Sequence, residues 1–224
     1  MPDCTMKAIE STLFHRVVQP RKPHPPSHPA VILLHGRGAD EEDLLGLAPY
    51  LDERLLIIAV RAPYAFQFGG GYTWYDVRDI GTPDPTMFKS SYDRLSTFID
   101  DALAQYPIER GRLYLLGFSM GTILSYALSL SRATMFRGVI ANSGYIAEGT
   151  HLTYSWNKVT STEFFVAHGT QDLVIPVQLA RRARQLLEEN HLRFEYKEYP
   201  MAHEISEESL HDGSAWLSKH LDRP

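Results

Sequence analysis

The sequence contains a single cysteine, Cys4, among its 224 residues. One cysteine excludes an internal disulfide and a cysteine-based metal site, and no catalytic motif surrounds this thiol. A long basic block is also lacking and the formal net charge is −5, so nucleic acid is not an indicated partner. No apolar run reaches membrane-spanning length and no signal-peptide pattern opens the chain. We therefore expect a cytoplasmic protein without stable membrane insertion.

Hydrophobic residues make up 44% of the chain, enough for a core. Residues 20–29 hold five prolines and can form neither a helix nor a central strand. His24 and His28 lie in this stretch without the carboxylate or cysteine that would favour a metal site. We expect one domain spanning the whole chain, whose residues 1–29 form an edge strand (Thr12 to Gln19) and this Pro-rich connector.

Short apolar runs alternate with helical patterns beyond the connector. Such runs are typical of buried strands in a parallel sheet, whereas the alternating stretch Arg193 to Tyr199 suits a strand nearer the edge. The runs are Ala30 to Leu34, Leu55 to Val60, Leu113 to Leu116, Gly138 to Ala141 and Phe164 to Ala167. Strand–helix alternation predicts an α/β fold with a mostly parallel sheet, right-handed crossovers and helices on both faces.

Helix start signals precede three of the helical patterns. Pro107 is expected to end the helix that contains Leu95 to Leu103. Segments 61–89 and 145–162 show no clear periodicity and are too short for a cap domain, so we expect them to form pocket walls. The start signals are Asp40 and Asp43 before Leu44 to Leu51, Ser90 with Asp93 before Leu95 to Leu103, and Pro176 before Leu179 to Leu187.

Gly117-Phe118-Ser119-Met120-Gly121 lies between a buried-type strand and a helical pattern. In this context the five residues predict a nucleophile elbow, a sharp turn that presents the serine hydroxyl above the sheet. The free N–H groups of the following helix favour an oxyanion beside that hydroxyl. A helix cap is the alternative role for Ser119.

A serine nucleophile needs a base, and the base needs a carboxylate to orient it. Asp172 directly follows the strand Phe164 to Ala167, and His203 follows the strand Arg193 to Tyr199. The order Ser119, Asp172, His203 is the one expected of an α/β-hydrolase. A loop-turn role for Asp172 and a helix N-terminal role for His203 are the alternatives, but one geometry explains all three residues.

Two backbone N–H groups are expected to bind the oxyanion. They are those of Met120, after the serine, and of Arg37, in the loop His35-Gly36-Arg37-Gly38, for which a plain strand-to-helix turn is the alternative. The Arg37 side chain is either solvated or binds an anionic substrate.

His35 and His168 lie at strand ends and are expected to hold their loops by hydrogen bonds. The histidines read as surface or helix residues are His15, His151, His191, His211 and His220.

These motifs resemble those of the phospholipase/carboxylesterase family of small α/β-hydrolases, which includes acyl-protein thioesterases and lysophospholipases. The resemblance extends from about Ala30 onward and implies a lidless serine esterase without cofactor or metal. It also implies the triad Ser119, Asp172 and His203 and the oxyanion amides named above. The expected substrate contacts are Gly36, Trp74, Phe118 and Val174. The matching motifs are Leu33 to Gly38, Trp74 to Asp76, Gly117 to Gly121, His168 to Asp172 with Val174 and Pro176, and Ala202 to Ile205.

The chain departs from the thioesterases at two points. They usually carry glutamine and two glycines after the serine, where this chain has Met120, Gly121 and Thr122, and an apolar residue where it has Arg37. These departures favour a broad, bacterial-type carboxylesterase acting on small-molecule esters with short to medium acyl chains, with thioesters left open. The alternatives are a lysophospholipase or long-chain deacylase with the same triad, and a non-catalytic ligand-binding protein of this fold. A homodimer is also left open.

Aromatic residues flank the run Gly69-Gly70-Gly71. Three glycines are costly to order, so Phe66, Phe68, Trp74 and Tyr75 could lie on a mobile loop over the site. Ordinary packing of these rings is the alternative.

Overall fold

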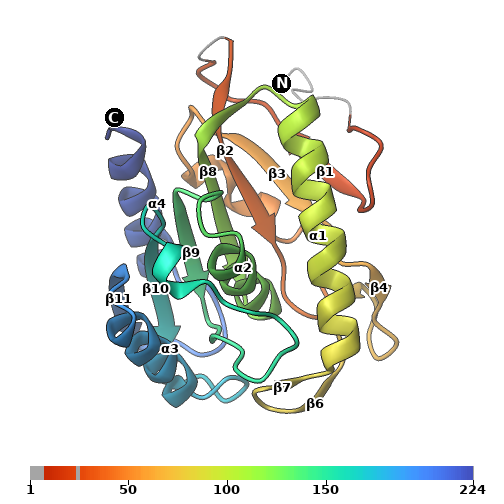
Figure 1. The fold of residues 1–224 in the computed structure, drawn as a ribbon, viewed down its shortest axis with the longest axis vertical. Coiled ribbons are helices and arrows are strands. Elements are labelled where there is room, and N and C mark those ends of the chain that lie inside the picture. The colour runs from red at the N-terminus through yellow and green to blue at the C-terminus, as the bar shows by residue number, and fades with distance from the viewer. Residues whose placement is uncertain (1–7, 24–25, 224) are drawn as a thin grey trace.

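The computed structural model describes residues 8–23 and 26–223, so Cys4 and His24 lie outside the described residues. One sheet has the strand order β1-β3-β2-β8-β9-β10-β11, with β1 antiparallel to β3 and the other pairs parallel (Figure 1). The predicted α/β-hydrolase fold is thereby confirmed. The strands are β1 His15–Val18, β2 His28–Leu34, β3 Leu56–Val60, β8 Ile108–Phe118, β9 Gly138–Asn142, β10 Glu163–Gly169 and β11 Arg193–Tyr199.

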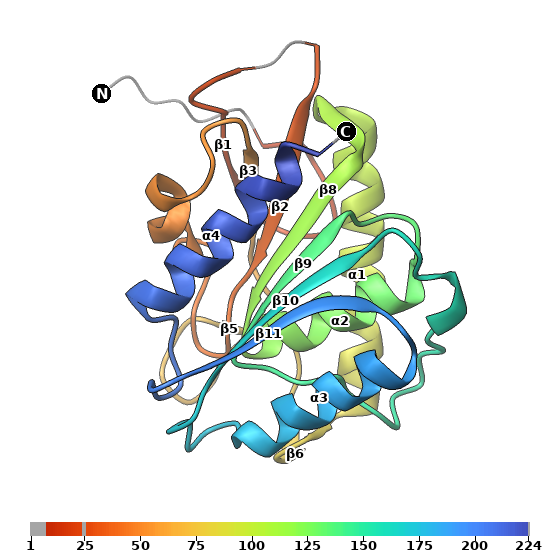
Figure 2. The same cartoon turned by 90° about the vertical axis from the view of Figure 1, so that its left-hand side faces the viewer.

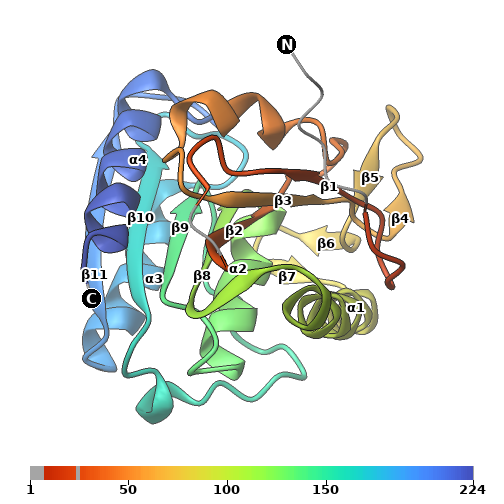
Figure 3. The ribbon, with the colours of Figure 1, turned by 90° about the horizontal axis from the view of Figure 1, so that it is seen from above.

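Helices cover both faces of the sheet (Figures 2 and 3). The side chains of β2 alternate between them: Ile32 belongs to a core cluster that includes residues of α1, α2 and α3, and Leu33 belongs to the cluster that includes residues of η1 and α4. Two hairpins, β4–β5 (Tyr64–Ala65 and Tyr72–Thr73) and β6–β7 (Val77–Asp79 and Thr82–Pro83), lie in the stretch before α1. The helices are η1 Leu44–Tyr50, α1 Pro85–Gln105, α2 Met120–Ser131, η2 Trp156–Lys158, α3 Val177–Glu189 and α4 Glu207–Leu221.

The segment after Asp43 is a 3-10 helix, η1. Pro49 lies inside it and supplies no backbone N–H, which disfavours regular α-helical bonding. Asp43 occupies the N-cap position, but its side chain makes no capping hydrogen bond to a described residue. The Asp40 carboxylate instead accepts the N–H of Glu42 at 2.9 Å, so the two aspartates order the turn differently from a standard cap.

The predicted start of α1 at Ser90 and Asp93 is wrong, because the helix begins at Pro85. Asp84 caps it by accepting the N–H groups of residues 86 and 87, and a proline is well suited to the first helical position. The helix ends before Pro107, as predicted. The helix Glu207–Leu221 was not among the predicted helical segments, although Ser206 caps α4 by accepting the N–H of Ser209.

The interpretation of His15 as a surface or helix residue is wrong. His15 lies in β1 with 2% of its surface exposed, and its Nε2 is 2.6 Å from the Tyr106 hydroxyl. His220 does lie in a helix, but its side chain is buried and contacts Glu163, the first residue of β10. This is the opposite end of the sheet from the loops that follow the parallel strands. Both histidines therefore help to pack the core.

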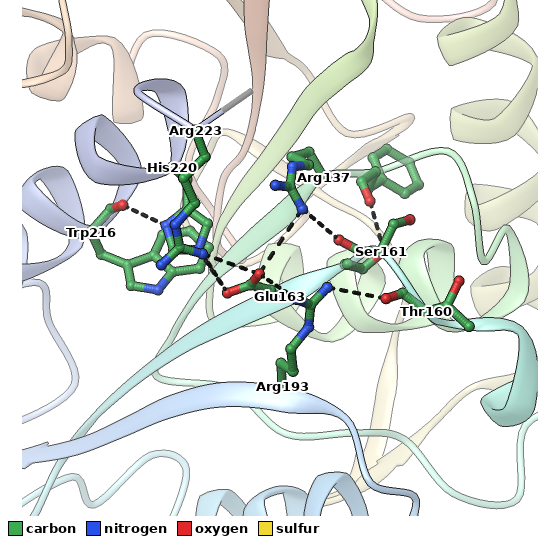
Figure 4. A network of polar contacts seen from close by, with 10 residues as sticks. Arg137, Thr160, Ser161, Glu163, Arg193, Trp216, His220 and Arg223 are labelled. Carbon is green, nitrogen blue, oxygen red and sulfur yellow. Dashed lines mark hydrogen bonds and ion pairs between the residues drawn. The ribbon is translucent and has the colours of Figure 1, made fainter.

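Glu163, at the start of β10, binds basic groups from several elements (Figure 4). Its Oε2 lies 2.8 Å from Nε2 of His220 and 3.1 Å from Nη1 of Arg223, and its Oε1 lies 3.2 Å from Nη1 of Arg193. Burial raises the pKa of Glu163, but the hydrogen bond from His220 and the nearby positive charges outweigh it and lower the pKa below its ordinary value. This carboxylate ties the C-terminal end of α4 to β10.

Replacing Glu163 with glutamine should lower the free energy of unfolding by about 2 kcal/mol at neutral pH, because its basic partners then lose their counter-charge. Since the folded pKa of Glu163 is depressed, its charge stabilises the fold above the ordinary value of 4.5, and this contribution is lost as the pH falls. Urea unfolding at several pH values measures the difference. The exposed Glu195, on β11, gives a control through Glu195→Gln, which should change stability by less than about 0.5 kcal/mol. An equal loss for both variants would contradict the prediction.

Candidate active site

Ser119 occupies a strained turn between β8 and α2. Its φ is +54°, a left-handed conformation that costs a non-glycine residue free energy. A Cβ at Gly121 would overlap the carbonyl oxygen of Leu34, so only glycine lets α2 start this close to β2. The Ser119 side chain makes no capping hydrogen bond with the described residues. Its hydroxyl therefore remains available for a partner above the sheet.

That partner is His203, in the loop between β11 and α4. The Ser119 Oγ lies 3.0 Å from Nε2 of His203, and Nδ1 of the same ring lies 2.7 Å from Oδ2 of Asp172. A carboxylate can only accept, so Nδ1 carries a proton, and in the neutral ring Nε2 is free to accept the serine proton. The Phe118 ring contacts the imidazole at a centroid distance of 4.9 Å. The structure thus brings Ser119, His203 and Asp172 into one hydrogen-bonded series.

Asp172 is held by its own loop. Its Oδ1 accepts the N–H groups of Val174 and Ile175, each at 2.8 Å, while Oδ2 faces His203. Asp172 is 6% exposed, so these bonds form out of contact with bulk water. The loop-turn role considered from the sequence is therefore also present, and the same carboxylate orders the loop and orients the imidazole. A Cβ at Gly169 would overlap the Met201 carbonyl oxygen, so glycine lets the loops carrying Asp172 and His203 meet.

His168, near the end of β10, stabilises the loop that carries Asp172. The ring is fully buried, and its Nε2 lies 2.8 Å from the Ile175 carbonyl oxygen, to which it donates, and 3.5 Å from Oδ2 of Asp172. Burial lowers the pKa of His168, more than the Ile175 and Asp172 oxygens raise it. A neutral ring that donates from Nε2 holds the loop as expected from the sequence.

His35 performs the same task in the loop after β2. Its Nε2 accepts the N–H of Ala62 at 3.0 Å, so Nδ1 carries the proton and donates to the Gly36 carbonyl oxygen at 2.6 Å. Burial lowers the pKa of His35, which favours this neutral form. The Gly36 carbonyl and the Arg37 N–H belong to one planar peptide, so fixing the carbonyl also fixes the direction of that N–H.

A cavity of about 360 Å³ opens beside Ser119. Three of the expected substrate contacts, Gly36, Phe118 and Val174, line it. Segment 61–89 supplies much of the wall, whereas segment 145–162 contributes Tyr145. The lining residues are Gly36, Arg37, Gly38, Ala39, Asp43, Tyr75, Val77, Ile80, Gly81, Phe118, Ser119, Met120, Ile123, Tyr145, Val174, Ile175 and His203.

Trp74 does not line this cavity, so the expected substrate contact is corrected. Its indole is fully buried and donates from Nε1 to the His35 carbonyl oxygen at 2.9 Å, so it packs behind the loop after β2. Tyr75, the next residue along the chain, lines the cavity instead. Phe66 and Phe68 are likewise absent from the lining, and Phe68 is 88% exposed.

Sequence reasoning missed Ile123 as a cavity residue, and it expected segments 61–89 and 145–162 to form the walls without naming Tyr75 or Tyr145 as substrate contacts. The positions of Ile123 and Tyr145 in the sequence could have indicated that they lie near Ser119. Ile123 lies four residues after Ser119 and so on the same side of α2, and Tyr145 follows β9 at the carboxyl edge of the sheet. Tyr75 could not be distinguished from Trp74, because both lie in the irregular stretch between β5 and β6, where the sequence shows no periodicity.

A model of the phospholipase/carboxylesterase family matches residues 14–221. The chain belongs to this family. Its named relatives are carboxylesterases and acyl-protein thioesterases, and the chain is accordingly a hydrolase of the carboxylesterase type.

Curated relatives of the family include yeast thioesterases. Acyl-protein thioesterase 1 of Candida albicans is 29% identical over 205 residues, which cover 82% of this chain and 88% of that protein. Acyl-protein thioesterase 1 of Kluyveromyces lactis is 28% identical over 214 residues, with 88% and 93% covered.

Solved carboxylesterases share the fold. The crystal structure from Mesorhizobium loti has a TM-score of 0.84 at 17% identity and covers 96% of this chain and 99% of its own. The Bacillus cereus carboxylesterase has a TM-score of 0.80 at 21% identity, with 93% and 94% covered. None of the helices in residues 8–23 and 26–223 combines the length and apolar character that crossing a bilayer requires.

Proposed function

We propose that this family member is a serine esterase that hydrolyses carboxylic esters through an acyl-enzyme, with Ser119, His203 and Asp172 as its catalytic triad. One observation carries the proposal: the hydrogen-bonded series from Ser119 through His203 to Asp172, with distances of 3.0 and 2.7 Å. Both distances suit proton transfer by a positioned imidazole. The strained backbone at Ser119 supports the same role, since strain concentrates at functional sites.

Catalysis then proceeds in two halves. Nε2 of His203 takes the Ser119 proton as Oγ attacks the ester carbonyl, and Asp172 stabilises the imidazolium that forms. The tetrahedral intermediate collapses when the bond to the alcohol breaks and His203 passes its proton to that alcohol. Water repeats the sequence on the acyl-enzyme, which releases the carboxylic acid and restores Ser119.

The backbone N–H groups of Arg37 and Met120 are proposed to bind the oxyanion. Both residues line the cavity beside Ser119. Met120 is the first residue of α2, so its N–H has no acceptor within the helix. The Arg37 N–H is held in direction by the bond from His35 to the Gly36 carbonyl. Donors fixed in advance stabilise the developing charge without reorganisation.

The cavity favours short to medium acyl chains. Apolar side chains from Val77, Ile80 and Ile123 form part of the wall of this cavity of about 360 Å³. A long-chain deacylase is the alternative with the same triad. Thioesters enter the proposal as second substrates, because thioesterases are among the relatives.

A panel of p-nitrophenyl esters from acetate to palmitate tests this range, with matching thioesters measured in parallel. We expect kcat/KM to peak between butyrate and octanoate and to be at least about tenfold lower for palmitate, because the longer chain exceeds the cavity. A maximum at palmitate would favour the long-chain alternative. No hydrolysis of any ester would favour the non-catalytic alternative.

The expectations about domain organisation and cofactors are part of the same proposal. We propose that the chain is a single domain that works without a cofactor. Its cytoplasmic location and a homodimer stay predictions, for which cell fractionation and size-exclusion chromatography are the measurements.

A further inference from the structure

The cavity beside Ser119 carries a guanidinium without a counter-charge, that of Arg37. No described carboxylate lies within 4.0 Å of it, whereas Arg54, Arg61 and Arg182 each form a two-point contact with an acidic side chain. Its Cζ lies 5.5 Å from the centre of the Phe66 ring, a cation–π contact that holds the charge beside the β4–β5 hairpin. Arg37 lines the cavity and Phe66 does not, so this contact places the positive charge at the side of the cavity next to the hairpin.

Tyr75 supplies a second group without a partner. Its side chain lines the same cavity and is fully buried, and its hydroxyl has no hydrogen-bond partner among the described residues. Burial raises the pKa of Tyr75 well above its ordinary value, Tyr145 and Tyr154 raise it further, and the Arg37 charge lowers it. Arg37 and Tyr75 line the same cavity. A buried donor left unpaired is unfavourable, and an oxygen of a bound ligand relieves it.

Asp43 is the acidic residue in the cavity lining, but it does not neutralise Arg37. Burial raises the pKa of Asp43, the His35 charge lowers it and the Asp40 charge raises it, and no ion pair within 4.0 Å joins this carboxylate to Arg37 in the described structure. The carboxyl therefore belongs to the start of η1. Among the described side chains that line the cavity, Arg37 thus supplies a cation without an ion pair, and Tyr75 supplies a hydroxyl without a hydrogen-bond partner.

We propose that the preferred substrate is an ester that carries a second, anionic group, a carboxylate, bound by the Arg37 guanidinium and the Tyr75 hydroxyl. One cation and one neutral donor match a monoanion, and a guanidinium binds carboxylate oxygens with good geometry. This inference rests on the proposed esterase function. Water cleaves only the ester bond, so the products are an alcohol and an acid, one of which retains the second carboxylate unchanged.

Matched esters test the inference. Mono-p-nitrophenyl adipate and p-nitrophenyl hexanoate differ by a carboxylate in place of a terminal methyl group, so the ratio of their kcat/KM values measures recognition of the anion. We expect the wild-type ratio of kcat/KM values to exceed about 10, because a hydrogen bond to a charged group is strong enough to give this difference. The ratio should decrease at high salt, because salt screens the charges. Comparing 4-acetoxybenzoate with p-tolyl acetate places the carboxylate on the alcohol instead and shows which side of the ester it occupies.

Substitutions of Arg37 and Tyr75 test whether these residues cause the preference for the anionic ester. Arg37→Gln and Tyr75→Phe should each lower it about tenfold, and Arg37→Lys should restore part of it because the charge returns. Any effect of Arg37→Gln on the backbone amide acts on both esters and cancels in the ratio. Arg94→Gln is the matched control, since Arg94 is a cation 5.9 Å from the Tyr64 ring and does not line the cavity.

The outcomes separate the two proposals. If the wild-type protein hydrolyses neither member of a pair, the esterase function fails and the inference fails with it. If it hydrolyses the neutral esters but both pairs give ratios near 1 that the Arg37 and Tyr75 variants leave unchanged, the inference alone is overturned. A ratio lowered equally by Arg94→Gln would also overturn it, because a general charge effect would then suffice.

Discussion

Replacing Ser119 with alanine is expected to lower kcat for p-nitrophenyl butyrate by about a million-fold, the loss typical of removing a triad nucleophile. The variant lacks the Oγ atom that lies 3.0 Å from His203, so no acyl-enzyme can form. Folding should be retained, since the hydroxyl caps no helix in the described structure and alanine is no larger.

Ser129→Ala is the matched control for this variant. Ser129 is buried on the same helix, where its hydroxyl donates to the Tyr126 carbonyl oxygen, and it does not line the cavity. Its activity should stay within about threefold of wild type, as a small local change implies. If a correctly folded Ser119→Ala protein kept a tenth of wild-type turnover, Ser119 could not be the nucleophile.

Asp172→Asn should lower kcat by about ten-thousand-fold, because the amide selects the wrong form of His203. The asparagine oxygen can still accept the N–H groups of Val174 and Ile175, which bind Oδ1 in the wild type. Its NH₂ group then faces Nδ1 of His203, which must become an acceptor. The ring proton moves to Nε2, where it blocks removal of the Ser119 proton.

Parallel measurement of Asp93→Asn controls for the loss of a carboxylate. Asp93 is exposed on α1 and pairs with Lys89, so its removal should change kcat by less than about twofold. Activity of Asp172→Asn within tenfold of wild type would contradict an orienting role for Asp172. Thermal unfolding of each variant separates loss of catalysis from loss of structure.

The strands could be predicted because burial on both faces leaves continuous apolar runs. The stretch Arg193 to Tyr199 was predicted with the same bounds as β11, whereas β8 begins five residues before the predicted Leu113. Polar residues at the start of β8, among them Arg110 and Arg112, interrupt the apolar pattern there without interrupting the strand. Helix starts were harder to predict, because Asp84 and Ser90 are both favoured capping residues and the sequence does not show which one caps α1.

The candidate site could be anticipated from position along the chain. Residues that directly follow parallel strands meet at the carboxyl edge of the sheet, so Ser119, Asp172 and His203 were expected together. The cavity wall could not be derived, because it depends on which side of the backbone each residue of segment 61–89 faces. For this reason Trp74 and not Tyr75 was named as a substrate contact. The tautomer of His35 was equally inaccessible, since it depends on the distant N–H of Ala62.

The catalytic assignment is tested most directly by reacting the folded wild-type protein with a fluorophosphonate and mapping the modified peptide by mass spectrometry. Such a reagent bonds to a serine that a neighbouring base has activated. A single adduct per chain on Ser119, absent from Ser119→Ala, is the predicted result. An unmodified protein, or an adduct at another serine, would contradict it.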